Sequence, residues 1–156
     1  MTKNLIGSLF AISLVFTSTV GLSAEIEFEY FSSPSKNINC IYENSRGDTP
    51  VLQVRCDIMQ FKPTLNLRPI ETKESIEIFG HCTKDKMRAF TIDINSTETK
   101  VTCPSDAPIS INQPILPYNH SWQKNGLACV SQTSGMRCYN NLGHGFFLSR
   151  NQQSIF

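Results

Sequence analysis

The sequence predicts an all-β fold, a compact sheet or sandwich of hairpins stapled by three disulfides. Short runs of apolar and β-branched residues alternate with clusters of Gly, Pro, Asn and Ser, which is the pattern of strands separated by turns. Six cysteines are spaced so that successive pairs bracket three strand–turn–strand units. No apolar pattern with a helical period is long enough to predict a helix of convincing length.

The first 24 residues have the pattern of a secretory signal peptide. Lys3 supplies a positive charge, residues 5–16 form an apolar core, and small residues offer a cleavage site after Ser23 or Ala24. The core is too short for a good bilayer span, so we expect no integral membrane span after cleavage; an uncleaved anchor is the alternative. The expected organisation is a signal peptide of residues 1–24 and a single disulfide-stabilised β domain of residues 25–156, periplasmic or secreted.

The charge balance excludes several classes of partner. Because Lys3 is the only charged residue of the signal segment, its removal leaves as many basic as acidic residues. A neutral domain lacks the basic excess that binds nucleic acid or anionic lipid. We therefore expect no nucleic acid partner, and another envelope or extracellular protein is the partner class left open.

The cysteines indicate an oxidising compartment and paired sulfur atoms. Their spacing favours sequential pairing over the many other connectivities, as Cys40–Cys56, Cys82–Cys103 and Cys129–Cys138. On the chain-entropy description, closing the first loop stabilises the fold by about 3 kcal/mol. The chain contains no C-x-x-C motif, and the adjacent His81 and Cys82 do not have the spacing of zinc ligands, so we expect neither a metal nor another cofactor.

The N-terminal part is expected to contain three strands. Residues 24–31 alternate glutamate with apolar residues and predict a half-buried strand with one apolar face. Residues 37–43 resume an extended pattern, and residues 44–50 form a polar loop punctuated by Gly and Pro. Residues 51–58 then predict the returning strand.

The middle of the chain is less regular. Residues 60–72 contain two prolines and little periodicity, so they predict an extended connection over the surface, and residues 73–79 fit either a strand or a short helix. Residues 87–94 and 99–103 flank a polar turn and predict another hairpin. Four prolines make the next segment, residues 104–117, a rigid and irregular crossing.

The C-terminal third predicts a hairpin stapled to itself. Residues 127–132 and 136–139 lie on either side of a turn, with Cys129 and Cys138 at similar distances from it. A second turn at residues 143–145 leads into an apolar run. Two sequences close a cysteine-bracketed hairpin in the same way, by internal duplication or independently: Val54-Arg55-Cys56 and Met136-Arg137-Cys138.

His144 is a weak candidate for catalysis. Its two glycine neighbours favour a backbone with positive φ and leave the imidazole unshielded, as a general acid or base requires. The favoured alternative is a tight turn into the next strand, because no partners for a catalytic triad are recognisable.

Tyr118 and Trp122 are, with His144, the candidate binding residues. Both are amphipathic aromatics of the kind found on recognition surfaces, although single aromatics belong more often to a core. An exposed apolar patch around them favours binding. A cleft that joins His144 to Asp57 or Asp106 favours an enzyme instead.

Several blocks of the sequence carry a resemblance to a known family. They are Ser33-Pro34-Ser35-Lys36-Asn37-Ile38-Asn39-Cys40, Val54-Arg55-Cys56-Asp57-Ile58, Cys103-Pro104-Ser105-Asp106, Leu116-Pro117-Tyr118 with Ser121-Trp122, Ser134-Gly135-Met136-Arg137-Cys138, Gly143-His144-Gly145-Phe146-Phe147-Leu148-Ser149-Arg150 and the ending Ile155-Phe156. Together they resemble a small secreted bacterial domain of unknown function, and the resemblance covers nearly all of residues 25–156. It implies a bacterial origin and a periplasmic or secreted location, but no activity. Members often carry Asp-Trp-Gly after the third cysteine, whereas Cys82 is followed by Thr83-Lys84-Asp85, so a role of that loop does not carry over.

The leading hypothesis for function is a non-enzymatic secreted or periplasmic binding module, with inhibition of a protein such as a cell-wall hydrolase as one form of it. It depends on the small stapled scaffold, the neutral charge and the lack of a recognisable nucleophile–base constellation. The alternatives are a small hydrolase that uses His144 with a carboxylate, and a structural envelope protein.

Overall fold

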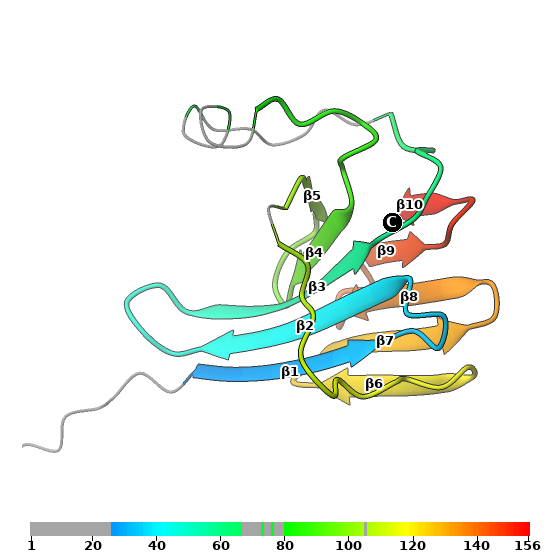
Figure 1. The fold of residues 1–156 in the computed structure, drawn as a ribbon. Coiled ribbons are helices and arrows are strands. Elements are labelled where there is room, and N and C mark those ends of the chain that lie inside the picture. Colours follow the sequence, from blue (N-terminus) through cyan, green and yellow to red (C-terminus); the bar gives the residue numbers. More distant parts are fainter. Residues whose placement is uncertain (1–25, 67–72, 74–75, 77–79, 105) are drawn as a thin grey trace, which may run out of the picture.

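Two antiparallel sheets of five strands each form the layers of the molecule (Figure 1). The computed structural model describes residues 26–66, 73, 76, 80–104 and 106–156. The first sheet contains β1 (Ile26–Ser32), β2 (Ile38–Ser45), β3 (Val51–Ile58), β4 (Ala89–Asp93) and β5 (Lys100–Thr102). The second contains β6 (His120–Lys124), β7 (Leu127–Gln132), β8 (Gly135–Asn140), β9 (Gly145–Leu148) and β10 (Gln153–Ile155). Each sheet is a meander with its strands in chain order, so the predicted all-β fold is confirmed.

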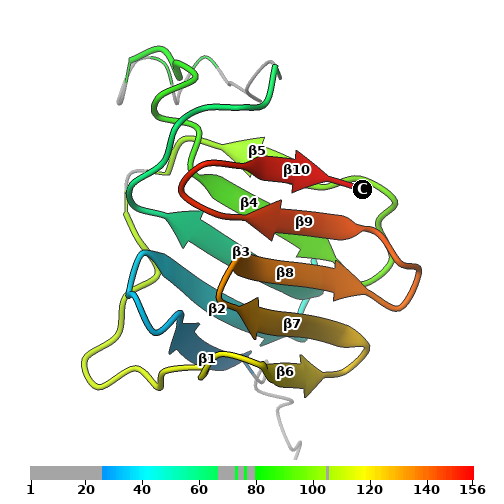
Figure 2. The same ribbon diagram turned by 90° about the vertical axis from the view of Figure 1, so that its right-hand side faces the viewer.

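The two sheets stack with their strands in the same lateral order (Figure 2). One row across the first sheet consists of Phe31, Cys40, Cys56, Phe90 and Val101. The matching row across the second consists of Trp122, Cys129, Cys138, Phe146 and Ile155. Equivalent members meet across the core: the Phe31 and Trp122 rings lie 5.1 Å apart, the Phe90 and Phe146 rings 5.8 Å apart, and the sulfur atoms of Cys56 and Cys138 3.5 Å apart. Burying each large aromatic side chain stabilises the fold by about 2–3 kcal/mol.

The two meanders therefore repeat one pattern. Cys56 of β3 and Cys138 of β8 are at equivalent positions, and so are the Val-Arg and Met-Arg pairs that precede them. Val54 and Met136 each lie two residues before the cysteine of their strand, and both are fully buried. The similarity seen in the sequence thus corresponds to a structural equivalence between the third strand of each sheet.

The three predicted disulfides are confirmed. Cys40–Cys56 joins β2 to β3 and Cys129–Cys138 joins β7 to β8, each with Cα atoms 4.1 Å apart and directly opposite in the ladder. Cys82–Cys103, with a Cα separation of 5.6 Å, ties the segment before β4 to the residue after β5. Three disulfides are consistent with an extracellular or periplasmic protein.

The glutamate-bearing face of β1 lies against the second sheet, although the sequence pattern predicts that this face is exposed to solvent. Its alternation predicts that the apolar side chains turn inward, yet Ile26 is 57% and Phe28 is 48% exposed on the outer face. Glu27 and Glu29 point toward β6 instead, where Lys124 pairs with both carboxylates. Of the apolar side chains of β1, only Phe31, at the end of the strand, reaches the core, on the same face as the two glutamates.

The connection between β5 and β6 crosses the outer face of the first sheet (Figure 1). Its residues 106–118 are called the strap below. The strap pairs with the edge strand where Ser32 donates to the carbonyl of Pro114 at 2.9 Å and accepts from Leu116 N–H at 2.8 Å. Gln113 also donates to the side chain of Asn39 at 3.1 Å. The irregular crossing predicted from the prolines is thus found, and it buries part of the outer face.

The segment after β3 runs along the β10 edge as an extended connection, as expected for residues 60–66. The buried side chain of Gln153 accepts hydrogen bonds from Thr64 N–H and its hydroxyl, both at 3.1 Å. Residues 67–72 of the predicted connection lie outside the described residues, as does the signal peptide of residues 1–24. Of residues 73–79, Lys73 and Ile76 have helical backbone and the others are not described. Among the described residues, no helix has the length and apolar character needed to cross a bilayer.

Strands β6 and β10 have no counterpart in the sequence-based prediction. β6 consists of His-Ser-Trp-Gln-Lys and β10 is only three residues long, so neither shows a run of β-branched residues. A signal for β6 does exist: Asn125 and Gly126, with φ of 47° and 83°, form the two-residue turn into β7. Asn-Gly is the pair that favours such hairpin turns, because both residues tolerate positive φ.

Candidate functional site

His144 lies in the turn between β8 and β9 and is half-buried. Of its two neighbours, Gly143 has a positive φ of 84°, but Gly145 does not. The expectation that both glycines supply positive φ is therefore wrong for Gly145. That residue is small for another reason: a Cβ there would lie 2.0 Å from the carbonyl oxygen of Cys138.

The turn around His144 is organised by a residue that the sequence analysis missed. Asn140 is 1% exposed, and its side-chain oxygen accepts from the N–H groups of Leu142 and His144, each at 3.1 Å. Its amide nitrogen donates to the carbonyls of Asp93 at 2.9 Å and Ser96 at 2.7 Å. All four hydrogen-bonding positions of the side chain are thus used, and they join the β8–β9 turn to the β4–β5 turn.

The carboxylates considered as partners of His144 lie elsewhere. The His144 turn is bonded through Asn140 to Asp93, at the end of β4. Asp57 is paired with Ala89, at the start of β4, so it lies at the opposite end of that strand. Asp57 faces the strap on the outside of the sheet, where its carboxylate is held by Arg55. Among the described residues, His144 and Asp57 therefore form no catalytic pair.

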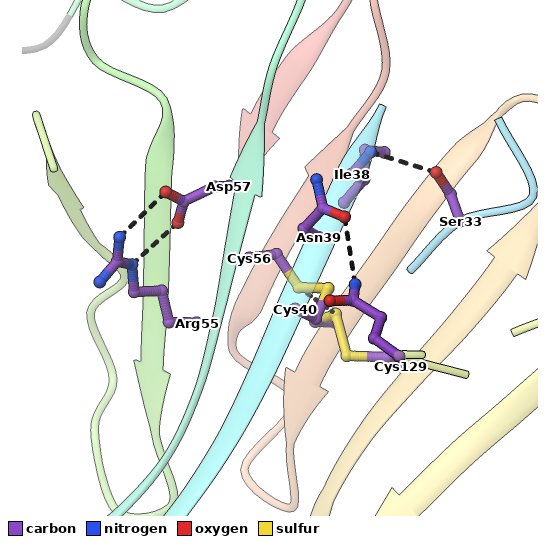
Figure 3. Close-up of a disulfide and its surroundings, with 10 residues drawn as sticks. Ser33, Ile38, Asn39, Cys40, Arg55, Cys56, Asp57 and Cys129 are labelled. Carbon is purple, nitrogen blue, oxygen red and sulfur yellow. Dashed lines mark hydrogen bonds and ion pairs between the residues drawn. A yellow bond between two sulfur atoms is a disulfide. The ribbon is translucent and has the colours of Figure 1, made fainter. Parts of the chain in front are cut away.

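The Arg55–Asp57 pair fastens the strap to the first sheet (Figure 3). Asp57 has no exposed side-chain surface, and it accepts from Arg55 Nε at 2.8 Å and Nη2 at 2.9 Å. Nη2 also donates to the carbonyl of Asp106 at 2.7 Å. Burial raises the pKa of Asp57, and the guanidinium opposes this shift. Asp57 thus holds the guanidinium of Arg55, which bonds to the strap, so the pair has a structural role.

Trp122 is part of the core on one side and of a surface on the other. Its ring stacks on Phe31 and lies tilted against Tyr42 with ring centroids 5.3 Å apart. Its Nε1–H donates to the carboxylate of Glu29 at 2.9 Å. The hydrogen bond from Lys124, and then that from Trp122, holds the pKa of Glu29 below its usual range. The indole is therefore fixed in one orientation.

A groove lies where Trp122 reaches the surface. This side groove has a volume of about 360 Å³ and is lined by residues 29–31 of β1, residues 110–116 of the strap, and Trp122. Ile111 on its rim is 92% exposed and Ile115 is 47% exposed. An exposed apolar patch is thus present beside Trp122, as the binding hypothesis requires. The sequence analysis missed these isoleucines, although apolar residues in a proline-rich segment without alternation are a signal for them.

Tyr118 lines a second cavity at one end of the sandwich. This end cleft has a volume of about 290 Å³. Its walls come from residues 33–38, residues 132–135 and residues 149–151, together with Tyr118. Serine, threonine, asparagine and glutamine make up most of its lining residues. The structure therefore separates the three predicted binding residues into the end cleft, the side groove and the opposite turn.

Among the described residues, one group of potential metal ligands lies close together, and it consists of cysteines. The sulfur atoms of Cys40, Cys56 and Cys138 lie within 4.8 Å of one another in the core. All of them belong to disulfides, and a disulfide sulfur lacks the thiolate charge that binds a metal. This sulfur cluster is therefore part of the packing.

Comparison with known proteins gives a family without an assigned activity. A protein-family model described as a family of unknown function (DUF6636) matches residues 8–156. No curated protein and no solved structure was found to match the chain.

Proposed function

The chain belongs to this family of unknown function, and from its geometry we propose that it is a non-enzymatic binding module that engages a protein along the side groove. Its place of action is the bacterial periplasm or exterior, in keeping with the disulfides and the signal-peptide pattern. A small, neutral, stapled domain of this kind fits an inhibitor of an envelope protein such as a cell-wall hydrolase.

The observation that carries the proposal is an open strand edge next to the groove. The backbone groups of Ser32 that face away from β2 are bonded to the strap. By the alternation of an antiparallel ladder, those of Ile26, Phe28 and Tyr30 face the same way, and they have no backbone partner among the described residues. The strap thus begins to pair with β1 and stops after one bridge, Ser32 with Ile115.

An extended segment of a partner can continue this pairing. Backbone hydrogen bonds along an open edge provide affinity, and pockets beside the edge select side chains. The groove suits an apolar side chain, because Ile111 and Ile115 flank it and its one carboxylate, Glu29, is already neutralised by Lys124. Phe28 and Ile26 extend the apolar surface along the strand.

The proposal is tested with the mature protein as bait for soluble envelope proteins of the source cell, with quantification by mass spectrometry. The variants are the double substitution Ile111→Glu with Ile115→Glu, and the control Leu142→Glu. Leu142 is 53% exposed in the His144 turn, away from the groove. We expect at least one protein to bind the wild type and the control and to be lost with the double variant.

A purified partner identified in this way is then titrated calorimetrically. The groove variant should weaken its binding by at least tenfold, which corresponds to about 1.4 kcal/mol. Binding that survives the double substitution contradicts the proposal. If no protein binds the wild type, the structural-envelope alternative replaces it.

A further inference from the structure

The end cleft is built by parts of the chain that are far apart in sequence. The turns between β1 and β2, β7 and β8, and β9 and β10 meet on the right-hand side of Figure 1, and the end of the strap brings Tyr118 to the same place. None of these turns lines the side groove. The cleft is therefore a separate surface, and its chemistry differs from that of the apolar groove.

The cleft offers donors and acceptors that the fold does not use. The side chains of Gln132, Thr133, Ser134 and Asn151 are exposed and make no hydrogen bond to a described residue. The hydroxyl of Tyr118 is likewise unbonded, and this residue is 38% exposed. Hydroxyl and amide groups can both donate and accept, so the lining suits a ligand with the same dual capacity.

The parts of the cleft next to these groups are held by hydrogen bonds within the fold. In the first turn, Ser33 Oγ accepts from Ile38 N–H at 3.1 Å (Figure 3). The side chain of Asn37 is held at both ends by the backbone of Gln60, with distances of 2.8 and 3.0 Å. On the opposite wall Arg150 donates to the side chain of Gln60 at 2.9 Å. A prearranged wall reduces the ordering entropy that a ligand must overcome.

The backbone at the rim is itself held in a less favourable conformation. Lys36 has a φ of 57° and adjoins the wall residue Asn37. A left-handed conformation at a residue other than glycine or asparagine costs roughly 1 kcal/mol, and such conformations concentrate at ligand sites. This observation is independent of the free polar groups and indicates the same surface.

The charge of the cleft narrows the ligand class. Among the described residues that line it, Arg150 is the only charged one, and one of its nitrogens is bonded to Gln60. None of its described lining residues is a carboxylate, so this part of the chain offers no anionic group for a cation. A single shared guanidinium also lacks the cluster of donors that anion sites use. The favoured ligand is uncharged.

We propose that the end cleft binds a neutral carbohydrate, with a sugar ring against Tyr118 and its hydroxyls bonded to the Thr133–Ser134 turn. The face of a pyranose ring is a flat array of C–H groups that packs on an aromatic ring, while its rim carries hydroxyls. The volume, near the lower end of the roughly 300–1,000 Å³ usual for ligand pockets, matches one or two rings.

The test is a titration of the ¹⁵N-labelled mature protein, followed by NMR. The probes are maltotriose, cellotriose and the trimer of N-acetylglucosamine, with inorganic phosphate and sulfate as the charged arm. We expect at least one trisaccharide to give saturable shifts of the amide signals at residues 118–119 and 132–135. Phosphate and sulfate should give none.

Variants separate this site from the side groove. Tyr118→Ala should weaken trisaccharide binding by about tenfold, because one stacking platform is lost, without changing the melting temperature. Ile111→Glu should leave sugar binding unchanged, so that the outcome does not depend on the proposed function. The inference is overturned if none of the three sugars shifts the cleft signals, if only phosphate or sulfate does, or if Tyr118→Ala binds like the wild type.

Discussion

At the scale of single residues, the most consequential side chains are buried polar ones that no motif reveals. Asn140 is an ordinary residue in the sequence, yet its four hydrogen bonds connect two turns. His144, which stands out between two glycines, contributes its backbone to this arrangement. A motif search weighs unusual residue types, whereas the energetic weight of a polar side chain depends on how completely it is buried and bonded.

We predict that Asn140→Ala destabilises the protein by about 3 kcal/mol, because two carbonyls and two N–H groups lose their partner in a buried site. His144→Ala should cost less than about 1 kcal/mol, since its backbone contacts remain. Urea unfolding at neutral pH measures both. Asn141→Ala, at an exposed neighbour, is the control. Equal losses for Asn140→Ala and His144→Ala would contradict this ranking.

The two glycines beside His144 should respond to alanine for different reasons. At Gly143 a Cβ meets open space, so alanine costs only the positive φ, about 1 kcal/mol. At Gly145 the Cβ would lie 2.0 Å from the Cys138 carbonyl and 2.7 Å from the Cα of Tyr139, so β9 must move away from β8. We expect about 3 kcal/mol or more for Gly145→Ala. Thermal unfolding of both variants measures the two losses of stability. An equal loss for Gly143→Ala and Gly145→Ala would refute the steric explanation.

At the scale of elements, the sequence predicts strands well where the pattern reports burial and poorly where it does not. The hairpin of β2 and β3 and that of β7 and β8 follow from their apolar runs and their cysteines. β1 was predicted as a strand, but which face it buries was not deducible, because that depends on Lys124, which lies 97 residues away from Glu27. The side groove could not be predicted for the same reason, because it forms only where the strap lies beside β1, and these segments are far apart in the sequence.

The cluster of Glu27, Glu29 and Lys124 predicts a pH dependence with two ends. The pKa of Glu29 is lowered from 4.5, so its contribution to stability is complete above that value and is lost as the pH falls through the lower folded pKa. The pKa of Lys124 is raised from 10.5, chiefly by its hydrogen bonds to Glu27 and Glu29. Its contribution is therefore complete below that value and is lost as the pH rises through the folded pKa.

We predict that Glu29→Gln lowers the free energy of unfolding by less than about 1 kcal/mol near neutral pH, because the pair is partly exposed and screened. This difference from the wild type should shrink as the pH falls through the lowered pKa of Glu29, and it should vanish once the carboxylate is protonated. The fluorescence of Trp122, the single tryptophan, follows unfolding at the cluster itself. Glu98→Gln, at an exposed glutamate outside the cluster, is the matched control. A Glu29 difference that does not decrease as the pH is lowered from neutral would rule out the charge-based explanation.

At the scale of the whole molecule, the two meanders meet through their disulfides. The sequential pairing was predictable because each pair closes a local hairpin. The stacking of one staple on the other was not, since it depends on how two independent sheets face each other. The equivalence of the Val54-Arg55-Cys56 and Met136-Arg137-Cys138 segments places both staples at the centre of their sheets, and this is why their sulfur atoms touch.

This contact predicts a specific rearrangement when one staple is opened. In Cys40→Ala, the thiol of Cys56 remains 3.5 Å from the sulfur of Cys138. As a thiolate, Cys56 attacks Cys138, a Cys56–Cys138 bond forms, and Cys129 leaves as the new thiolate. The product joins the two sheets directly. We expect the exchange during refolding at about pH 8.5, where a free thiol is substantially ionised.

Alkylation under denaturing conditions, followed by peptide mapping, should find the free thiol of Cys40→Ala distributed between Cys56 and Cys129. Cys82→Ala is the matched control: it also leaves one thiol, at Cys103, but that residue lies outside the sulfur cluster of Cys40, Cys56 and Cys138. Its label should therefore stay on Cys103. A label found only on Cys56 in the first variant would contradict this prediction. It would show that the Phe31–Trp122 and Phe90–Phe146 ring pairs keep the two sheets too far apart for the new bond to form.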